Sequence, residues 1–362
     1  MIRIGIIGCG GIANGRHITE LSMIKECKIT ALCDTNTDAL KKTAARLNLD
    51  APHCFTDYKA LVDCADVDAV EICTPNYLHV PMAEYAVTKG KPINVEKPLA
   101  LKTEDTQHLE ELLTINQVPN MMCFSYRFFP AVRYAKSILD KGLLGQVVSV
   151  NVEYLKSSAF WEGRRLDWRF IRKYAGTGVL GDLGVHLIDM AQLLVGDIRR
   201  VSAVSGIVVK QRQRLDCDEL ADVETDDYCN FIADITDQRT GEIVPATFVI
   251  SRCALGHANT IKYNIFGTDG VLSFNLNNPE VLDVCIGEVD KACDGLHTVR
   301  VPAKYKITQE QMFIDLIGGK KCEHLPSIAD GVKCQRVLDA ILESATSRTC
   351  VEISPCNTSE LK

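Results

Sequence analysis

The feature that most constrains the fold is the opening segment, in which a run of mostly apolar residues leads directly into a glycine-rich turn. Residues 2–8 read IRIGIIG, which is typical of a strand buried on both faces of a sheet. The turn GCGGIA places Gly8, Gly10 and Ala13 at the spacing G-x-G-x-x-G/A. Glycines at this spacing let backbone N–H groups approach a pyrophosphate at the start of a helix. The segment therefore predicts a strand–turn–helix unit that binds a dinucleotide.

The first third of the chain repeats this alternation of strand and helix. Further strands are expected at 28–34, 69–75, 92–98 and 120–125, and helices at 37–47, 82–90 and 103–116. Such βαβ alternation predicts an α/β domain with a parallel, doubly wound sheet, the Rossmann arrangement, over residues 1–125.

The pattern changes after about residue 125. Helices are expected at 130–141, 308–319 and 329–346, and long β-rich segments at 146–156, 200–210, 226–236, 244–254 and 260–276. We expect residues 126–362 to form an α+β domain with a large open sheet, mixed or antiparallel. Because a large sheet face must be covered, this domain also predicts a homo-oligomer.

Composition narrows the possible classes of protein. The 362 residues carry a formal net charge of −7 and no Lys/Arg run, which argues against a nucleic-acid partner. No apolar run approaches the roughly 20 residues that span a bilayer, and the N-terminus is unlike a signal peptide. The 16 cysteines are scattered and form no C-x-x-C pair, which predicts free thiols in a reducing cytoplasm and no structural zinc site.

Polar residues follow several of the expected strands, where an open α/β sheet binds its ligands. An acid at Asp34 accepts hydrogen bonds from ribose hydroxyls, and with no adjacent cation it favours NAD over NADP. The predicted cofactor-binding residues are Gly8, Gly10, Gly11, Ile12, Asp34, Thr74, Pro75, Asn76, His79, Glu96 and Lys97. Alternatively, Pro75, Asn76 and His79 only cap the next helix, and Glu96 and Lys97 are a solvated charge pair.

An acid and a base stand four residues apart in the apolar stretch GDLGVHLID at 181–189. Four residues is about one helical turn, so Asp182 and His186 share one face of a helix. The pattern fits a catalytic pair. It also fits a purely structural role, with Asp182 capping the helix and His186 held in the core.

Four motifs occur in order along the chain: G-x-G-x-x-A, T-P-N-x-x-H, E-K-P and G-D-L-G-x-H-x-x-D. As a set, at these separations, they resemble the glucose–fructose oxidoreductase / inositol dehydrogenase / MocA (Gfo/Idh/MocA) family over essentially the whole chain. The resemblance implies that Lys97, Asp182 and His186 meet at the substrate carbon beside NAD. His186 is then the general base, Lys97 stabilises the developing alkoxide, and Asp182 accepts from a neighbouring hydroxyl. This chemistry needs no metal.

Further substrate contacts are expected from two clusters. Tyr126 and Arg127 lie in SYRFFP, and Trp161, Arg164 and Trp168 lie in WEGRRLDWR. Aromatic rings beside charged hydrogen-bonding groups suit a sugar. The same residues fit a loop anchor with solvated arginines, and both readings stay open.

The resemblance implies an NAD-dependent dehydrogenase that oxidises a ring secondary alcohol. The substrate is then a sugar, a glycoside (oxidised at C3 of a glucoside) or an inositol. One alternative is a glycoside-cleaving enzyme that oxidises C3, eliminates the aglycone and reduces again with the same NAD. Another is a non-catalytic NAD- or sugar-binding sensor. The presence of Lys97, Asp182 and His186 together argues against a sensor.

Overall fold

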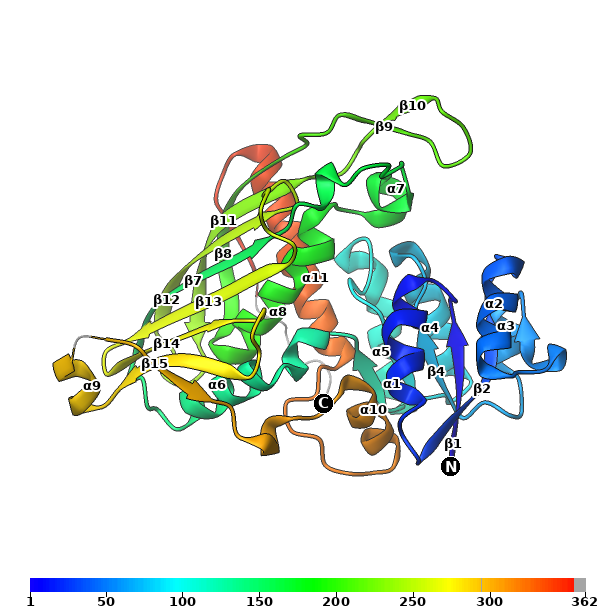
Figure 1. The fold of residues 1–362 in the computed structure, drawn as a ribbon, viewed down its shortest axis with the longest axis horizontal. Coiled ribbons are helices and arrows are strands. Elements are labelled where there is room, and N and C mark those ends of the chain that lie inside the picture. The colour runs from blue at the N-terminus through cyan, green and yellow to red at the C-terminus, as the bar shows by residue number, and fades with distance from the viewer. Residues whose placement is uncertain (294, 355–362) are drawn as a thin grey trace. The chain divides into compact units, whose positions relative to one another are not determined.

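The chain forms two compact units. The computed structural model describes residues 1–293 and 295–354 (Figure 1). The first unit combines Met1–Cys123 with the later segment Thr308–Val332, and the second contains Phe124–Ile307 and the chain from Lys333 onward. The return of residues 308–332 to the first unit was not predicted from the sequence. Its physical reason lies in helix α10 (Gln309–Ile317), which packs against α1 (Ile18–Leu21).

The first unit is built on a parallel sheet. Within the described residues it has six strands in the order β3-β2-β1-β4-β5-β6, and every neighbouring pair is parallel. The strands are β1 (Ile2–Ile7), β2 (Cys27–Cys33), β3 (Cys54–Phe55), β4 (Ala69–Ile72), β5 (Ile93–Val95) and β6 (Asn120–Met122). The predicted doubly wound parallel sheet is confirmed. The edge strand β3 was missed because two residues carry no readable pattern.

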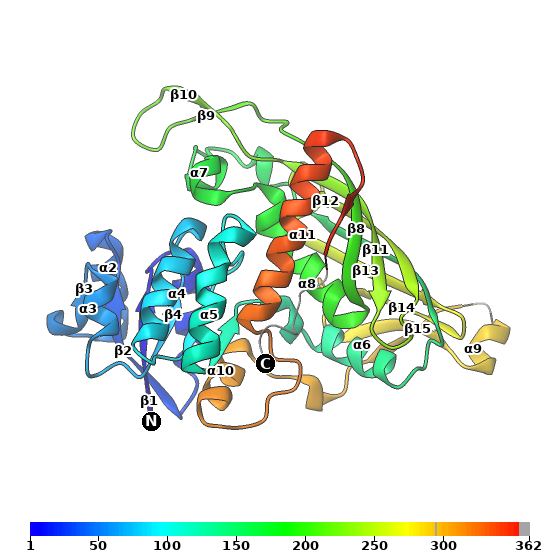
Figure 2. The ribbon, with the colours of Figure 1, turned by 180° about the vertical axis from the view of Figure 1, so that it is seen from behind.

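Helices connect these strands. They are α1, α2 (Thr37–Leu47), α3 (Tyr58–Val62), α4 (His79–Thr88) and α5 (Gln107–Asn116), whereas α10 comes from later in the chain and packs against α1. Figure 2 shows α4 and α5 side by side, in agreement with their contact. Local sequence explains the ends of α2, because the Asn36 side chain accepts from two backbone N–H groups and Asn48 adopts the left-handed conformation that ends a helix.

The second unit is built on an open mixed sheet, as predicted. Among the described residues it has nine strands in the order β16-β15-β14-β13-β7-β12-β11-β8-β17, in which only β7 and β12 pair in parallel. The strands are β7 (Val147–Leu155), β8 (Gly196–Gly206), β11 (Tyr228–Asp237), β12 (Ile243–Ser251), β13 (Thr260–Gly267), β14 (Gly270–Asn275), β15 (Val281–Ile286), β16 (His297–Arg300) and β17 (Val351–Glu352). A separate hairpin pairs β9 (Gln211–Gln213) with β10 (Leu220–Asp222).

Helices cover one face of this sheet and leave the other open. They include α6 (Pro130–Asp140), α8 (Val185–Leu194) and α11 (Ile328–Ser347), and α8 contacts both β7 and β8. The unit also contains the short helices α7 (Arg172–Ala175) and α9 (Glu288–Cys293), of which α9 contacts β15. Along β12 the side chains alternate, so that Phe248 is buried and stacks on Phe231 while Val249 is exposed. This alternation is typical of a sheet with one covered face.

The cysteines that the structure describes are free thiols, and several of them are buried as small apolar side chains. Among the described residues, no helix is both long enough and apolar enough to cross a membrane.

Candidate functional site

Most of the predicted cofactor-binding residues follow the parallel strands of the first unit. Gly8 follows β1, Asp34 follows β2, Thr74 follows β4, and Glu96 and Lys97 follow β5. Because these strands are parallel neighbours, their carboxyl ends share one edge of the sheet. The sheet thus gathers motifs that lie far apart in the sequence.

The glycine-rich loop is shaped for a close-lying ligand. Gly8 has a φ of +100°, and a Cβ there would lie 2.6 Å from the Cys73 carbonyl oxygen, so only glycine fits. At Gly10 and Gly11 an added Cβ would meet no atom within 4 Å, so that the backbone borders open space. Helical turns begin directly at Gly11 and include a π turn (Ala13–His17). Open backbone at a helix start is what a pyrophosphate requires.

Asp34 is held against this loop. One carboxylate oxygen accepts from the Cys9 N–H at 2.7 Å, and the other accepts from the Asn36 N–H at 2.7 Å. The carboxylate is therefore fixed at the end of β2, next to the glycine-rich turn, where the sequence predicts the ribose.

His79 joins two of the predicted loops. It is fully buried, and its ring nitrogens lie 2.8 Å from the Pro98 carbonyl oxygen and 2.8 Å from the Thr74 carbonyl oxygen. Burial lowers the pKa of His79. The ring thus ties the T-P-N turn to the E-K-P turn. Its predicted contact with the cofactor stays a prediction, as do those of Thr74, Pro75 and Asn76.

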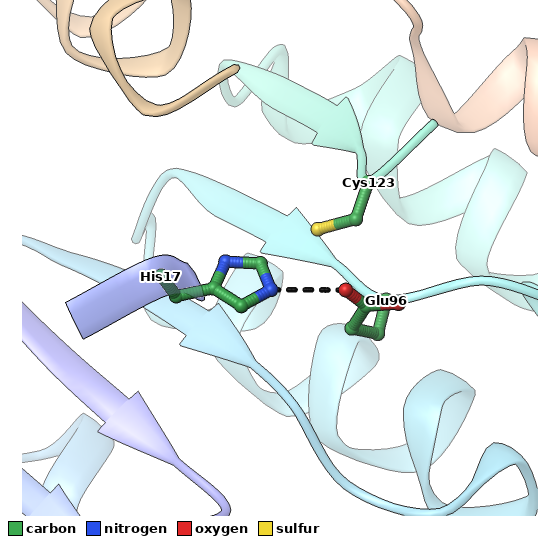
Figure 3. A group of neighbouring side chains, drawn as sticks. All are labelled: His17, Glu96 and Cys123. Atoms are coloured by element: carbon green, nitrogen blue, oxygen red, sulfur yellow. Dashed lines mark hydrogen bonds and ion pairs between the residues drawn. The ribbon is translucent and has the colours of Figure 1, made fainter. Parts of the chain in front are cut away.

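Glu96 faces a buried cluster that the sequence analysis missed. His17 Nε2 hydrogen-bonds Glu96 Oε1 at 2.9 Å (Figure 3). The other nitrogen, Nδ1, lies 2.8 Å from Glu310 Oε1 and 3.3 Å from Glu71 Oε2. His17, Glu71 and Glu310 are fully buried, and Glu96 is nearly so. One imidazole therefore sits among three carboxyl groups, which we call the His17 cluster.

The charges in the His17 cluster follow from this arrangement. Burial opposes the charged form of His17, but its acidic neighbours, first Cys73 and then Glu310, outweigh burial and raise its pKa well above the usual value. Burial likewise opposes the Glu96 carboxylate, but the hydrogen bond and charge of His17 lower its pKa to about 2. Burial and the neighbouring Glu310 raise the pKa of Glu71. The cluster is thus an imidazolium between two carboxylates, with a third carboxyl group protonated.

The donor set of this cluster includes Cys123 and Cys73 within reach of His17 and could in principle hold a metal ion. However, the two ring nitrogens of His17 lie 2.9 and 2.8 Å from carboxylate oxygens, and the raised pKa of His17 favours the protonated ring, which offers a metal no lone pair. A cation is already present in the form of the imidazolium. The cluster supports the E-K-P turn instead, because Glu96 Oε2 accepts from the backbone N–H of Lys97 at 3.1 Å.

In the second unit, the helix that carries the acid–base pair is capped by other residues. Asp182 lies in a π turn (Leu180–Gly184) and His186 in the first turn of α8. The first N–H groups are bound elsewhere: Asp226 accepts from Gly178 and Leu180 at 2.7 and 2.8 Å, and Thr177 Oγ1 accepts from Gly181 at 2.7 Å. Capping therefore does not explain Asp182.

His186 is nearly buried and stacks on Tyr126, with ring centroids 4.2 Å apart at 30°. The Tyr126 hydroxyl lies 2.6 Å from that of Tyr154, which donates to Asn259 Oδ1 at 2.8 Å. Since Tyr154 has one proton and gives it to Asn259, Tyr126 donates to Tyr154. The sequence predicted Tyr126 but not Tyr154, and it left Asn259 unassigned. A tyrosine in a regular strand pattern gives no sign of this pairing.

The other predicted substrate residues differ in their surroundings. Arg127 is buried and forms a two-pronged ion pair with Asp189, at 2.8 and 2.5 Å. It therefore fastens the segment after β6 to α8. Trp161 is 52% exposed, and Arg164 lies over its ring. Trp168 carries the Arg169 guanidinium on its face.

Comparison with known proteins agrees with this arrangement. Residues 2–124 match the oxidoreductase family with an NAD-binding Rossmann fold, and residues 132–273 match the GFO/IDH/MocA C-terminal domain. The chain belongs to the Gfo/Idh/MocA oxidoreductase family. The motif-based expectation is thereby confirmed for the family, the fold and the NAD-binding domain.

Individual family members match along nearly their whole length. A levoglucosan dehydrogenase from Pseudarthrobacter phenanthrenivorans is 28% identical, over 97% of this chain and 98% of that protein. A glucose-6-phosphate 3-dehydrogenase from Bacillus subtilis is 25% identical, over 99% of this chain and 100% of that protein. A solved levoglucosan dehydrogenase in complex with NADH and levoglucosan matches with a TM-score of 0.85 at 27% identity, covering 98% of this chain and 100% of that chain.

Proposed function

We propose that this family member is an NAD-dependent dehydrogenase that oxidises a ring secondary alcohol of a sugar, at C3 of a glucose-type ring. The observation that carries the proposal is the pair Asp182 and His186, one turn apart on a helix whose cap is supplied by Asp226 and Thr177. Full-length similarity to dehydrogenases whose names specify levoglucosan and glucose 6-phosphate supports a sugar substrate. The free, buried thiols fit a reducing cytoplasm.

The first unit fits the cofactor that this reaction needs. Gly10 and Gly11 border open space, and Asp34 stands at the end of β2 with no adjacent lysine or arginine. NAD, when bound, supplies the acceptor for the hydride. The Gly8–Ile12 loop would hold its pyrophosphate and Asp34 its ribose, which selects against a 2′-phosphate.

Lys97 in the E-K-P turn and His186 in α8 act on the reacting hydroxyl group. Lys97 donates to the substrate oxygen and stabilises the charge that develops there. His186 accepts the hydroxyl proton at a ring nitrogen, a task suited to an imidazole near neutral pH. Asp182 accepts from a neighbouring hydroxyl and so orients the ring. Tyr126, stacked on His186, limits the movement of the base.

The open face of the nine-stranded sheet is the proposed oligomer interface. Val148, Val204, Ile232, Ile243 and Val249 are all more than two-fifths exposed on β7, β8, β11 and β12. Apolar side chains on several adjacent strands are typical of an interface between copies of a chain.

The test is a screen for NADH formation by the purified protein with NAD. The substrates are levoglucosan, glucose, glucose 6-phosphate, methyl glucosides and inositols. NADH should accumulate with at least one sugar. If instead a glucoside loses its aglycone with no net NADH, the NAD-recycling glycoside-cleaving reaction replaces this proposal. If no sugar is turned over or binds, the proposal is wrong.

A further inference from the structure

Three arginines converge on one phenylalanine in the second unit. The guanidinium carbons of Arg212, Arg164 and Arg252 lie 4.5, 4.9 and 5.5 Å from the centre of the Phe170 ring. They come from three distant segments: the β9 strand, the loop that carries both tryptophans, and the residue after β12. Three like charges around one ring repel one another, so this arrangement needs a compensating anion.

No anion offsets the charge of the most deeply buried arginine, Arg252, among the residues that the structure describes. Arg252 is 1% exposed, and both of its terminal nitrogens are buried with no hydrogen-bond partner. Arg212 is 6% exposed, and among the described residues its guanidinium donates to the carbonyl oxygens of Ala159 and Arg164 and to no carboxylate. A buried guanidinium without a carboxylate partner is strongly unfavourable, because it has lost its water and gained nothing equivalent.

The nearby carboxylates do not neutralise the three arginines. Asp227 is fully buried, and one of its oxygens accepts from the N–H groups of Val208 and Val209. Asp167 accepts from the Arg169 N–H and faces the Arg169 guanidinium at 3.8 Å. None of the ion pairs among the described residues involves Arg164, Arg212 or Arg252. Even with Asp227 counted in full, the cluster keeps a charge of about +2.

The cluster is graded from the interior to the surface. Arg252 is deepest, Arg212 is slightly exposed, and Arg164 is half-buried beside Trp161, which is 52% exposed. Lys156 adds a further cation over the same tryptophan. Trp161 and Arg164 are therefore the parts of the cluster that face solvent. The Arg252 N–H donates to the Asp227 carbonyl oxygen at 2.9 Å, and the preceding residue, Asp226, caps the acid–base helix. Arg252 therefore lies near that helix.

We propose that Arg164, Arg212 and Arg252 form a subsite for an anionic substituent of the sugar, and that this substituent is a phosphate monoester. The inference rests on the proposed function, because it names the substrate class of the same site. A phosphate monoester carries nearly two negative charges at neutral pH and presents three acceptor oxygens, which matches a cluster of charge about +2. A carboxylate would leave one positive charge buried and unpaired.

The experiment measures ligand binding through thermal melting, in the presence of saturating NADH so that the glycine-rich loop is occupied. The ligands are inorganic phosphate, glucose 6-phosphate, glucuronate and glucose. The variants are Arg164→Met and Arg252→Met, which keep an unbranched apolar side chain and remove the charge. The control is Arg214→Met on the same hairpin segment, where the arginine is half-exposed and paired with Asp216.

The expected result has two parts. Glucose 6-phosphate should stabilise the wild type and Arg214→Met at lower concentration than glucose does, and Arg164→Met should weaken its binding roughly 10- to 100-fold, as expected for a lost charged hydrogen bond. Glucose binding should not change. Without ligand, Arg252→Met should melt at or above the wild-type temperature, because an unpaired buried charge has been removed.

Several outcomes would overturn the proposal. These are no stabilisation by any phosphate, equal stabilisation of Arg164→Met and wild type, preferential binding of glucuronate, or an Arg252→Met protein that melts well below wild type. Binding of glucose 6-phosphate without NADH formation would support the subsite while the proposed oxidation fails. Turnover of neutral sugars without any stabilisation by phosphate compounds would support the proposed oxidation and refute the phosphate subsite.

Discussion

Replacing His17 by glutamine should destabilise the first unit severely, although His17 lies in none of the family motifs. The substitution keeps the size and polarity of the side chain but removes the only cation within the His17 cluster. Glu96 and Glu310 then remain buried as carboxylates without the imidazolium that each faces at 2.9 and 2.8 Å. Glu71 changes little, because its raised pKa already keeps it protonated.

The expected loss of stability can be calculated from the cost of protonating the carboxylates that have lost the imidazolium. A glutamate with an unfolded pKa of about 4.3 costs roughly 3 kcal/mol to protonate at pH ~6.5, at about 1.4 kcal/mol per pH unit. At pH ~5 the same step costs about 1 kcal/mol. With one or two carboxylates affected, we expect a loss of about 3–6 kcal/mol at pH ~6.5 and about 1–2 kcal/mol at pH ~5, consistent with the usual cost of breaking a buried ion pair.

The wild-type cluster behaves differently over the same range of pH. The folded pKa of His17 is raised, so its contribution to stability is complete below the unfolded value of about 6.5 and is lost as pH rises through the folded value. The folded pKa of Glu96 is lowered to about 2, so its contribution is complete above about 4.3 and is lost as pH falls toward 2. Both contributions are complete between pH ~4.5 and ~6.5. Any change with pH in the stability difference between wild type and His17→Gln over this range therefore comes from the variant.

Urea unfolding followed by far-UV circular dichroism at these two pH values measures the effect. Both tryptophans, Trp161 and Trp168, lie in the second unit, so their fluorescence reports whether that unit unfolds at the same time. His53→Gln is the matched control, since His53 is partly exposed and its ring lies 3.5 Å from the exposed Asp66; it should change stability by less than about 0.5 kcal/mol. A loss below about 1 kcal/mol for His17→Gln at pH ~6.5, or an equal loss at both pH values, would refute the imidazolium assignment.

Four further predictions concern the proposed reaction and assembly. Lys97→Ala should lower kcat by ~10²–10³ with little change in NADH affinity by fluorescence titration; a near-wild-type kcat would contradict its role. His186→Ala should remove the low-pH limb of the kcat profile, whereas Asp182→Asn should keep the limb, raise KM for the sugar and leave the melting temperature unchanged. Asp34→Ala should narrow the preference for NAD over NADP, measured as a ratio of kcat/KM values; comparable wild-type values for both cofactors would show that Asp34 does not select. Ile232→Asp, on the open sheet face, should shift the protein to a smaller species in size-exclusion chromatography with light scattering, and an unchanged mass would exclude this face as the interface.

The fold could be predicted from the sequence because its main elements have strong periodic patterns. Runs rich in apolar residues mark the buried parallel strands around Ile4 and Val70, and runs rich in β-branched residues mark strands of the second unit such as β12. The path of the chain after β16 could not be predicted in the same way. The segment Thr308–Val332 returns to the first unit because Glu310 meets His17 and α10 packs on α1, and such a long-range pairing leaves no periodic trace.

The residues of the candidate site also fall into two groups, those that the sequence predicted and those that it did not. Residues with local signatures were found, such as Gly8, whose φ of +100° only glycine accommodates readily. Residues defined by a distant partner were missed, including Tyr154, His17 and Arg252. For Tyr154 and His17 the informative feature is a buried polar group with partners far away in the sequence, and for Arg252 it is a buried charge without a partner. Burial is a property of the folded chain, so no single stretch of sequence displays it.

The two clusters that the sequence left hidden differ in how their charges are balanced. In the His17 cluster both carboxylates face the imidazolium and the raised pKa of Glu71 favours its neutral form, so each charged group has a partner of opposite charge within the chain. The arginines around Phe170 have no such complement, and both terminal nitrogens of Arg252 lack a partner. A balanced buried network holds a turn in place and gains nothing from a ligand. An unbalanced one becomes more stable when a ligand of opposite charge arrives, and this difference is why the first is assigned to positioning Lys97 and the second to binding substrate.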